Sequence, residues 1–196
     1  RTKNFDGTEM SVEAKLKDMI FTIGENMNIR RFLVVEGVLT SYIHGKGSTG
    51  VIVKFEADDA AVANEGFAAF AKNIALQVAA MPVLYLDKDS VPAKDLEEEK
   101  SVILAQLAND PANAKKPDAI KEKMVLGRIS KFYDNNCLVD MTYVKDEDMK
   151  VGKYVEAVAS KNGAKMTITK FVRFEMGEGL EKKEENFADE VANMVK

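Results

Sequence analysis

The chain has 196 residues, of which 46% are hydrophobic and 31% charged, and its net charge is −4. That length suits one domain, or two small ones that share a core. The single cysteine, Cys137, excludes a disulfide framework, and with the single histidine, His44, it cannot supply a Cys/His zinc site alone. The acidic balance argues against a nucleic-acid partner. No run approaches the roughly 18 apolar residues of a membrane span, so we expect no membrane association.

The lone thiol fits a reducing compartment, so we expect a cytoplasmic protein, and no pattern calls for a cofactor or a metal. The chain begins with Arg1 rather than Met, and we expect its natural start to lie further upstream. Between residues 175 and 196 there are seven acidic and three basic side chains. Their helical spacing among lysines favours a solvated helix face over a metal site.

The first part of the chain predicts a helix, two strands and a second helix. Ser11 can cap the first helix and Gly24 can end it. Asp58 and Asp59 can cap the second, and Pro82 stops it. The predicted elements are a helix over 12–23, strands over 32–43 and 51–55 joined by the glycine-rich loop 45–50, and a long helix over 59–81.

The rest of the chain begins with two helices that are separated by a short polar loop at 109–116. Such a pair predicts an antiparallel helical hairpin over 91–134. The elements expected after it are an extended segment over 138–144, a helix over 151–162, a strand over 166–174 and an amphipathic helix over 187–195. In the last strand, one face should carry the apolar residues Met166, Ile168, Val172 and Phe174.

One order of elements occurs twice, over 51–81 and over 166–194: a strand, a Phe-Glu pair, an acidic loop and a helix. The repeat predicts an α+β fold with two related subdomains. Each subdomain would hold a small antiparallel sheet packed by helices, and the antiparallel helical hairpin would be inserted between them. The expected domains are 1–90, 91–134 and 135–196.

No motif in the chain points to catalysis. Cys137 and His44 are the only candidates for a thiol–imidazole pair, and nothing specific surrounds the cysteine. The glycine-rich loop lacks the Gly-Lys-Ser/Thr ending of a phosphate loop and joins two strands rather than a strand and a helix. The lysines at 115–123 are interrupted by acids and lack interleaved aromatics, which favours a solvated surface. The residues therefore favour a protein-interaction role without catalytic residues.

Four segments, in the same order, resemble motifs of the bacterial elongation factor Ts family. The stretch 23–32 reads IGENMNIRRF and is similar to that family's IGEN(I/M)xxRR segment. The other three are Tyr42-Ile43-His44-Gly45 followed by Gly50-Val51, which resembles Y-x-H-G…G-V; KMVLGR at 123–128; and FVRFEMGEGLE at 171–181. Together they cover most of the chain.

The resemblance implies a function and a partner. Members of this family promote GDP release from elongation factor Tu, the GTPase that delivers aminoacyl-tRNA, and they are not enzymes. The implied fold has two α+β subdomains and a helical hairpin used for dimerisation or partner contact, so a homodimer through the hairpin is expected as well. The alternative is a dimerisation or interaction fragment without exchange activity.

The resemblance also implies partner-binding residues. Ile23 matches a position near the contact with the GTPase domain, and His44 with Gly45 matches the hairpin that lies against that domain. Tyr143 and Val144 fall in a segment that, in the family, approaches the partner's β-domains. No catalytic or metal-binding residue is implied.

Two departures from the family pattern bear on activity. The family's T-D-F-V motif, whose Phe is central to GDP release, does not occur in this sequence. Met141 and Thr142 stand where the family has Gln-Pro, and Ser48 and Thr49 stand where it often has Arg and Ile. We therefore expect the C-terminal core and dimerisation region of a longer factor, with weak partner binding and poor stimulation of GDP release.

Overall fold

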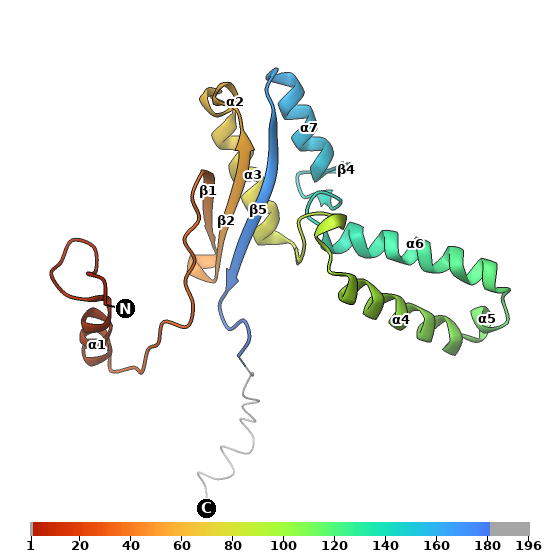
Figure 1. The fold of residues 1–196 in the computed structure, drawn as a ribbon, viewed down its shortest axis with the longest axis horizontal. Coiled ribbons are helices and arrows are strands. Elements are labelled where there is room, and N and C mark those ends of the chain that lie inside the picture. Colours follow the sequence, from red (N-terminus) through yellow and green to blue (C-terminus); the bar gives the residue numbers. More distant parts are fainter. Residues whose placement is uncertain (1, 181–196) are drawn as a thin grey trace, which may run out of the picture. The chain divides into compact units, whose positions relative to one another are not determined.

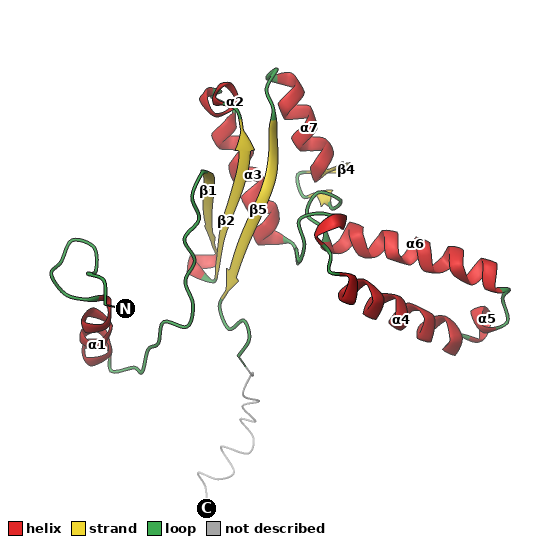
Figure 2. Ribbon diagram, viewed as in Figure 1, coloured by secondary structure: helices red, strands yellow, loops and turns green. Residues whose placement is uncertain are grey.

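The fold is that of a computed structural model, which describes residues 2–180. The chain divides into two compact units, Arg1–Val35 and Glu36–Lys196, and each is considered by itself. The helix predicted over 187–195, and the part of the acidic stretch beyond residue 180, lie outside the described residues. The described residues confirm the α+β class, with small antiparallel sheets and several helices (Figure 2).

The described part of the first unit contains one helix, α1 (Val12–Ile23), whose two ends are capped as the sequence predicts. The Ala14 amide donates to Ser11 Oγ at 3.1 Å, and Gly24 takes a φ of 79° while its amide donates to Ile20 O. The strand that was predicted to start at residue 32 begins only at Val38. The backbone before it is irregular up to Gly37, whose φ of 119° interrupts an extended chain.

The second unit is built on a three-stranded antiparallel sheet in the order β1-β2-β5 (Figure 1). Its strands are β1 (Val38–His44), β2 (Thr49–Ala57) and β5 (Met166–Glu175). Strand β5 belongs to the last predicted domain but pairs along β2, which belongs to the first. The two halves of the predicted repeat therefore share one sheet.

One face of this sheet packs on helix α3 (Phe67–Ala80) and forms the main core. The inward residues of β2 alternate with outward ones, as a half-covered strand requires. The fully buried side chains of this core include Val53, Phe55, Ile74 and Val78.

The β2–β5 pairing contains a bulge that the sequence did not reveal. The register shifts between Lys54 and Phe55, so that Thr169 has no partner on β2. One extra residue moves every later side chain to the other face. The prediction of one shared apolar face is therefore wrong. Met166 and Ile168 lie in the core, whereas Val172 and Phe174 lie on the face of the sheet that points away from α3.

The long helix predicted over 59–81 is broken into α2 (Asp59–Ala63) and α3. The Asn64 side chain accepts a hydrogen bond from the Gly66 amide at 2.8 Å, which competes with helical bonding at the break. Asp58 caps α2 through the Ala61 amide at 2.8 Å, and its other oxygen accepts the Lys165 amide at 2.9 Å. These two bonds hold the pKa of the Asp58 carboxyl below its usual value.

The helical hairpin consists of α4 (Ala93–Asn109), the single turn α5 (Pro111–Ala114) and α6 (Asp118–Asn136). The turn α5 lies within the polar loop expected at 109–116. The two long helices run side by side (Figure 1) and enclose a small core of Ile103, Leu107 and Ile129, separate from the main core. The hairpin therefore carries its own packing energy.

The segment after the hairpin is mostly a turn rather than the predicted extended chain. Residues 138–141 fold back, with the Asp140 and Met141 amides donating to Cys137 O. Only β3 (Thr142–Tyr143) is extended, and it pairs with β4 (Asp146–Lys150), a strand too polar to show an apolar alternation. Helix α7 (Val151–Lys161) follows as predicted. None of the helices within residues 2–180 is long and apolar enough to cross a membrane.

Candidate partner-binding site

The tip of the β1–β2 hairpin has a backbone that depends on glycine. The 3-10 turn Gly45–Gly47 follows His44 directly, and Gly45 and Lys46 both have a φ of 57°. A Cβ on Gly45 would lie 2.2 Å from Ser48 Oγ, well inside contact distance. The Ser48 amide donates to Gly45 O at 3.2 Å and closes the turn. The tip is thus a tight turn that a side chain at position 45 would distort.

His44 is exposed at the start of this tip. Its Nδ1 lies 3.1 Å from Tyr42 Oη, at hydrogen-bond distance, and the two rings are 5.9 Å apart. This contact orients the imidazole while its other edge stays open to solvent. Ile43, next to it, is 72% exposed and points to the opposite face of the sheet.

The end of β5 supplies a further surface beside the tip that the sequence reasoning did not assign. The Met176 amide donates to Ser48 O at 2.7 Å, which ties this end of β5 to the turn. Gly50 pairs with Ile43 on one side and with Phe174 on the other, and a Cβ on it would meet nothing within 4 Å. Ile43 and Phe174 are therefore exposed apolar side chains on either side of an open position, and Met176, just after the end of β5, is exposed as well. The only signal in the sequence was their place in two of the family motifs.

The two candidate residues at β3, Tyr143 and Val144, differ in how far solvent reaches them. Tyr143 is 4% exposed and stacks on Tyr154, with ring centroids 4.3 Å apart and planes 13° apart. Burial in this stack raises the pKa of its hydroxyl. Val144, the next residue, is 37% exposed. A partner can therefore reach the Val144 side chain, whereas the Tyr143 ring belongs to the core.

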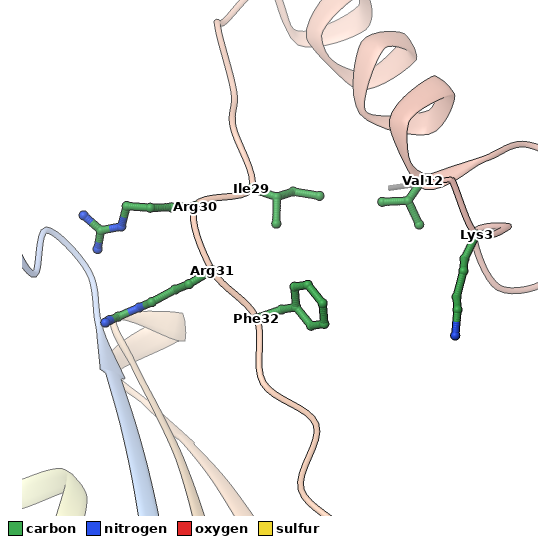
Figure 3. A pocket seen from close by; sticks show the side chains of 6 residues that line it. All are labelled: Lys3, Val12, Ile29, Arg30, Arg31 and Phe32. Atoms are coloured by element: carbon green, nitrogen blue, oxygen red, sulfur yellow. The ribbon is translucent and has the colours of Figure 1, made fainter.

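Ile23 lies in the other compact unit, as the last residue of α1, and is 54% exposed. A cavity of about 550 Å³ in the same unit does not include it (Figure 3). The side chains of Val12, Ile29 and Phe32 point toward one another across that cavity, while the side chains of Arg30 and Arg31 point away (Figure 3).

Cys137 directly follows α6 and is fully buried. Burial raises the pKa of its thiol to about 11, so almost none of it is thiolate near neutral pH. His44, at the end of β1, is bonded to Tyr42 instead. Within the part of the chain that the structure describes, no group of three or more His, Cys, Asp or Glu side chains could hold a metal ion.

An α+β core with an exposed hairpin tip and a projecting helical hairpin is typical of a protein that binds other proteins. The model of the family described as elongation factor TS matches residues 2–178. The elongation factor Ts of Clostridium kluyveri (strain ATCC 8527) is 43% identical over 188 residues. That of Clostridium botulinum (strain 657 / Type Ba4) is 45% identical over 189 residues. Each match covers 94% of this chain and 59% of the relative's length. The chain belongs to the elongation factor Ts family.

Proposed function

We propose that the chain contributes to guanine-nucleotide exchange on elongation factor Tu, by binding that GTPase and promoting GDP release. The observation that carries the proposal is the hairpin tip. His44 is exposed next to a turn that needs glycine at position 45. The resemblance to the family implies that both residues contact the GTPase domain. Membership of the family supplies the partner.

The proposed mechanism needs binding energy alone. A factor that binds the nucleotide-free GTPase more tightly than the GDP-bound one shifts the population toward release, and GDP weakens the factor's binding by the same ratio. In this proposal the tip at His44 meets the GTPase domain, Ile23 adds an apolar contact, and Val144 approaches the β-domains. Tyr143 contributes indirectly, because its stack on Tyr154 holds the backbone next to Val144 in place.

In this proposal the chain catalyses no reaction itself, and it acts in the cytoplasm together with the GTPase. The buried thiol of Cys137, with its pKa raised to about 11, supports this part because a nucleophilic cysteine must be a thiolate. The purified chain, without the GTPase, should therefore not hydrolyse GTP.

Stopped-flow release of fluorescent GDP from elongation factor Tu tests the proposal. We expect stimulation that is well below that of a family member carrying the T-D-F-V motif, and that unlabelled GDP in excess suppresses factor binding. Stimulation equal to such a member would contradict the expected weakness. No stimulation and no binding at high factor concentration would refute the function.

His44→Ala separates this function from the alternative of a self-associating fragment. The exposed apolar side chains on the hairpin, such as Leu104 (52%) and Leu126 (68%), favour self-association as the second candidate. We expect His44→Ala to slow stimulated release by about five- to tenfold, because an interface anchor is lost. Sedimentation velocity should show unchanged self-association. A variant that stimulates release like the wild type would remove His44 from the contact, whereas a wild type that self-associates without stimulating release would leave only the second candidate.

A further inference from the structure

Helix α3 places one fully buried amide against the candidate contact segment at β3. Gln77 is 0% exposed. Its Nε2 donates to Thr142 O at 3.0 Å, and its Oε1 accepts from the Val144 amide at 2.8 Å. Both ends of the carboxamide are therefore used, and both partners are backbone groups of the same short segment.

These two bonds reproduce strand pairing. Along an extended chain, the carbonyl of one residue and the amide of the residue two positions later point to the same side. A residue of a parallel neighbouring strand would bond to both. Gln77 does so with its side chain. The carboxamide thus takes the place of a missing strand for residues 142–144.

The pairing determines which side chains face outward. With the backbone held at residues 142 and 144, Tyr143 lies in the core on Tyr154, and Val144, which starts the turn between β3 and β4, stays exposed. Asn73, one helical turn before Gln77 on the same face of α3, adds to this arrangement. It donates to Tyr154 Oη at 3.2 Å and accepts from Lys145 Nζ at 2.6 Å.

We propose that Gln77 is a positioning residue for partner binding: it fixes the backbone of residues 142–144 so that Val144 is presented to the partner GTPase. The inference rests on the proposed function, because it assigns Val144 to the interface. Without the carboxamide, the Thr142 carbonyl and the Val144 amide lose these partners, and the segment must shift to form other hydrogen bonds.

Gln77→Met is the decisive variant, because methionine keeps the unbranched shape of the side chain and removes both hydrogen bonds. Val53→Ala is the matched control. Val53 is also 0% exposed and lies on β2, so the change weakens the main core without removing a bond to residues 142–144. Both variants are compared with the wild-type chain at a temperature where all three are folded. Asn73→Ala is the milder substitute if Gln77→Met does not fold.

The measurement is affinity for nucleotide-free elongation factor Tu by biolayer interferometry. We expect Gln77→Met to bind about five- to tenfold more weakly than Val53→Ala, through faster dissociation. Val144→Ala should weaken binding as well, and the double variant should be no weaker than the weaker single variant, because both act through one contact. Asn73→Ala should give a smaller loss with the same non-additivity.

Hydrogen exchange of the free protein gives a second measurement that needs no partner. We expect the Val144 amide to exchange at least tenfold faster in Gln77→Met, and to stay protected in Val53→Ala when the exchange is local. Equal affinity for Gln77→Met and the control, additive losses, or an unaffected Val144→Ala would overturn the inference while leaving the exchange function standing. A wild-type chain that does not bind the GTPase would overturn both.

Discussion

Gly45→Ala at the hairpin tip tests how strictly the turn depends on glycine. An alanine at a φ of 57° costs about 1 kcal/mol relative to glycine. The new Cβ would also lie 2.2 Å from Ser48 Oγ, so the serine must rotate away. Rotation gives up the bond from Ser48 Oγ to His44 O, which is long at 3.3 Å and contributes about 0.5 kcal/mol. The expected loss of unfolding free energy is about 1.5–2 kcal/mol.

Urea denaturation of wild type and variants measures this loss from the shift in midpoint at constant m-value. Gly50→Ala is the control, because Gly50 has no positive φ and a Cβ there would meet nothing within 4 Å. It should change stability by no more than about 0.5 kcal/mol. Adding Ser48→Ala to Gly45→Ala should cost little more, because the bond from Ser48 Oγ to His44 O is already lost in the single variant. An unchanged midpoint for Gly45→Ala, or an equal loss for Gly50→Ala, would refute the account of the turn.

Three further predictions concern the core, the helix cap and the hairpin. Burial raises the pKa of Cys137 to about 11, so between about pH 9 and 11 only the unfolded thiol ionises. The wild type should therefore lose stability relative to Cys137→Ala as the pH rises through this range. Parallel urea titrations of the two proteins that show no such divergence would contradict this prediction. The pKa of Asp58 is lowered in the folded state, so its carboxylate stabilises the fold at neutral pH, and this stabilisation is lost as the pH falls through the folded-state pKa. The difference in unfolding free energy between the wild type and Asp58→Ala should therefore disappear in acid. A difference that persists in acid would show that the charge of the carboxylate is not its cause. Leu107→Ala should cost about 2–4 kcal/mol in the hairpin core, and hydrogen exchange should speed up in α4 and α6 but not in β2; uniform acceleration would show that the hairpin and the sheet unfold together.

The helices were the part of the fold that local sequence predicted best. Caps such as Ser11 and Gly24 satisfy backbone groups within one turn, so neighbouring residues alone carry the signal. The two hairpin helices follow the same logic, since an apolar stripe and a polar loop are visible without knowing any partner. Where a side chain competed for the backbone, at Asn64, the single predicted helix proved to be two.

The strands were predicted less well because their partners are distant in sequence. The pairing of β5 with β2 joins residues more than 100 positions apart, and the bulge at Thr169 is visible only in that pairing. Strand β4 carries almost no apolar side chains, so its only signal is its bond pattern with β3. Extended structure depends on a neighbour that local sequence does not identify.

For the candidate site, sequence alone was enough to identify the candidates, which are one histidine, a glycine turn and a short segment carrying Tyr143 and Val144. Whether each of them is accessible to a partner depends on the folded chain. His44 is exposed because it ends a strand at a tight turn, and Tyr143 is buried because the alternation of a strand turns it onto Tyr154. Gln77 was invisible in the sequence, because only the fold brings its carboxamide to a backbone 65 residues away. The physical reason is that caps and turns are satisfied locally, whereas exposure and strand pairing depend on chain segments that meet only after folding.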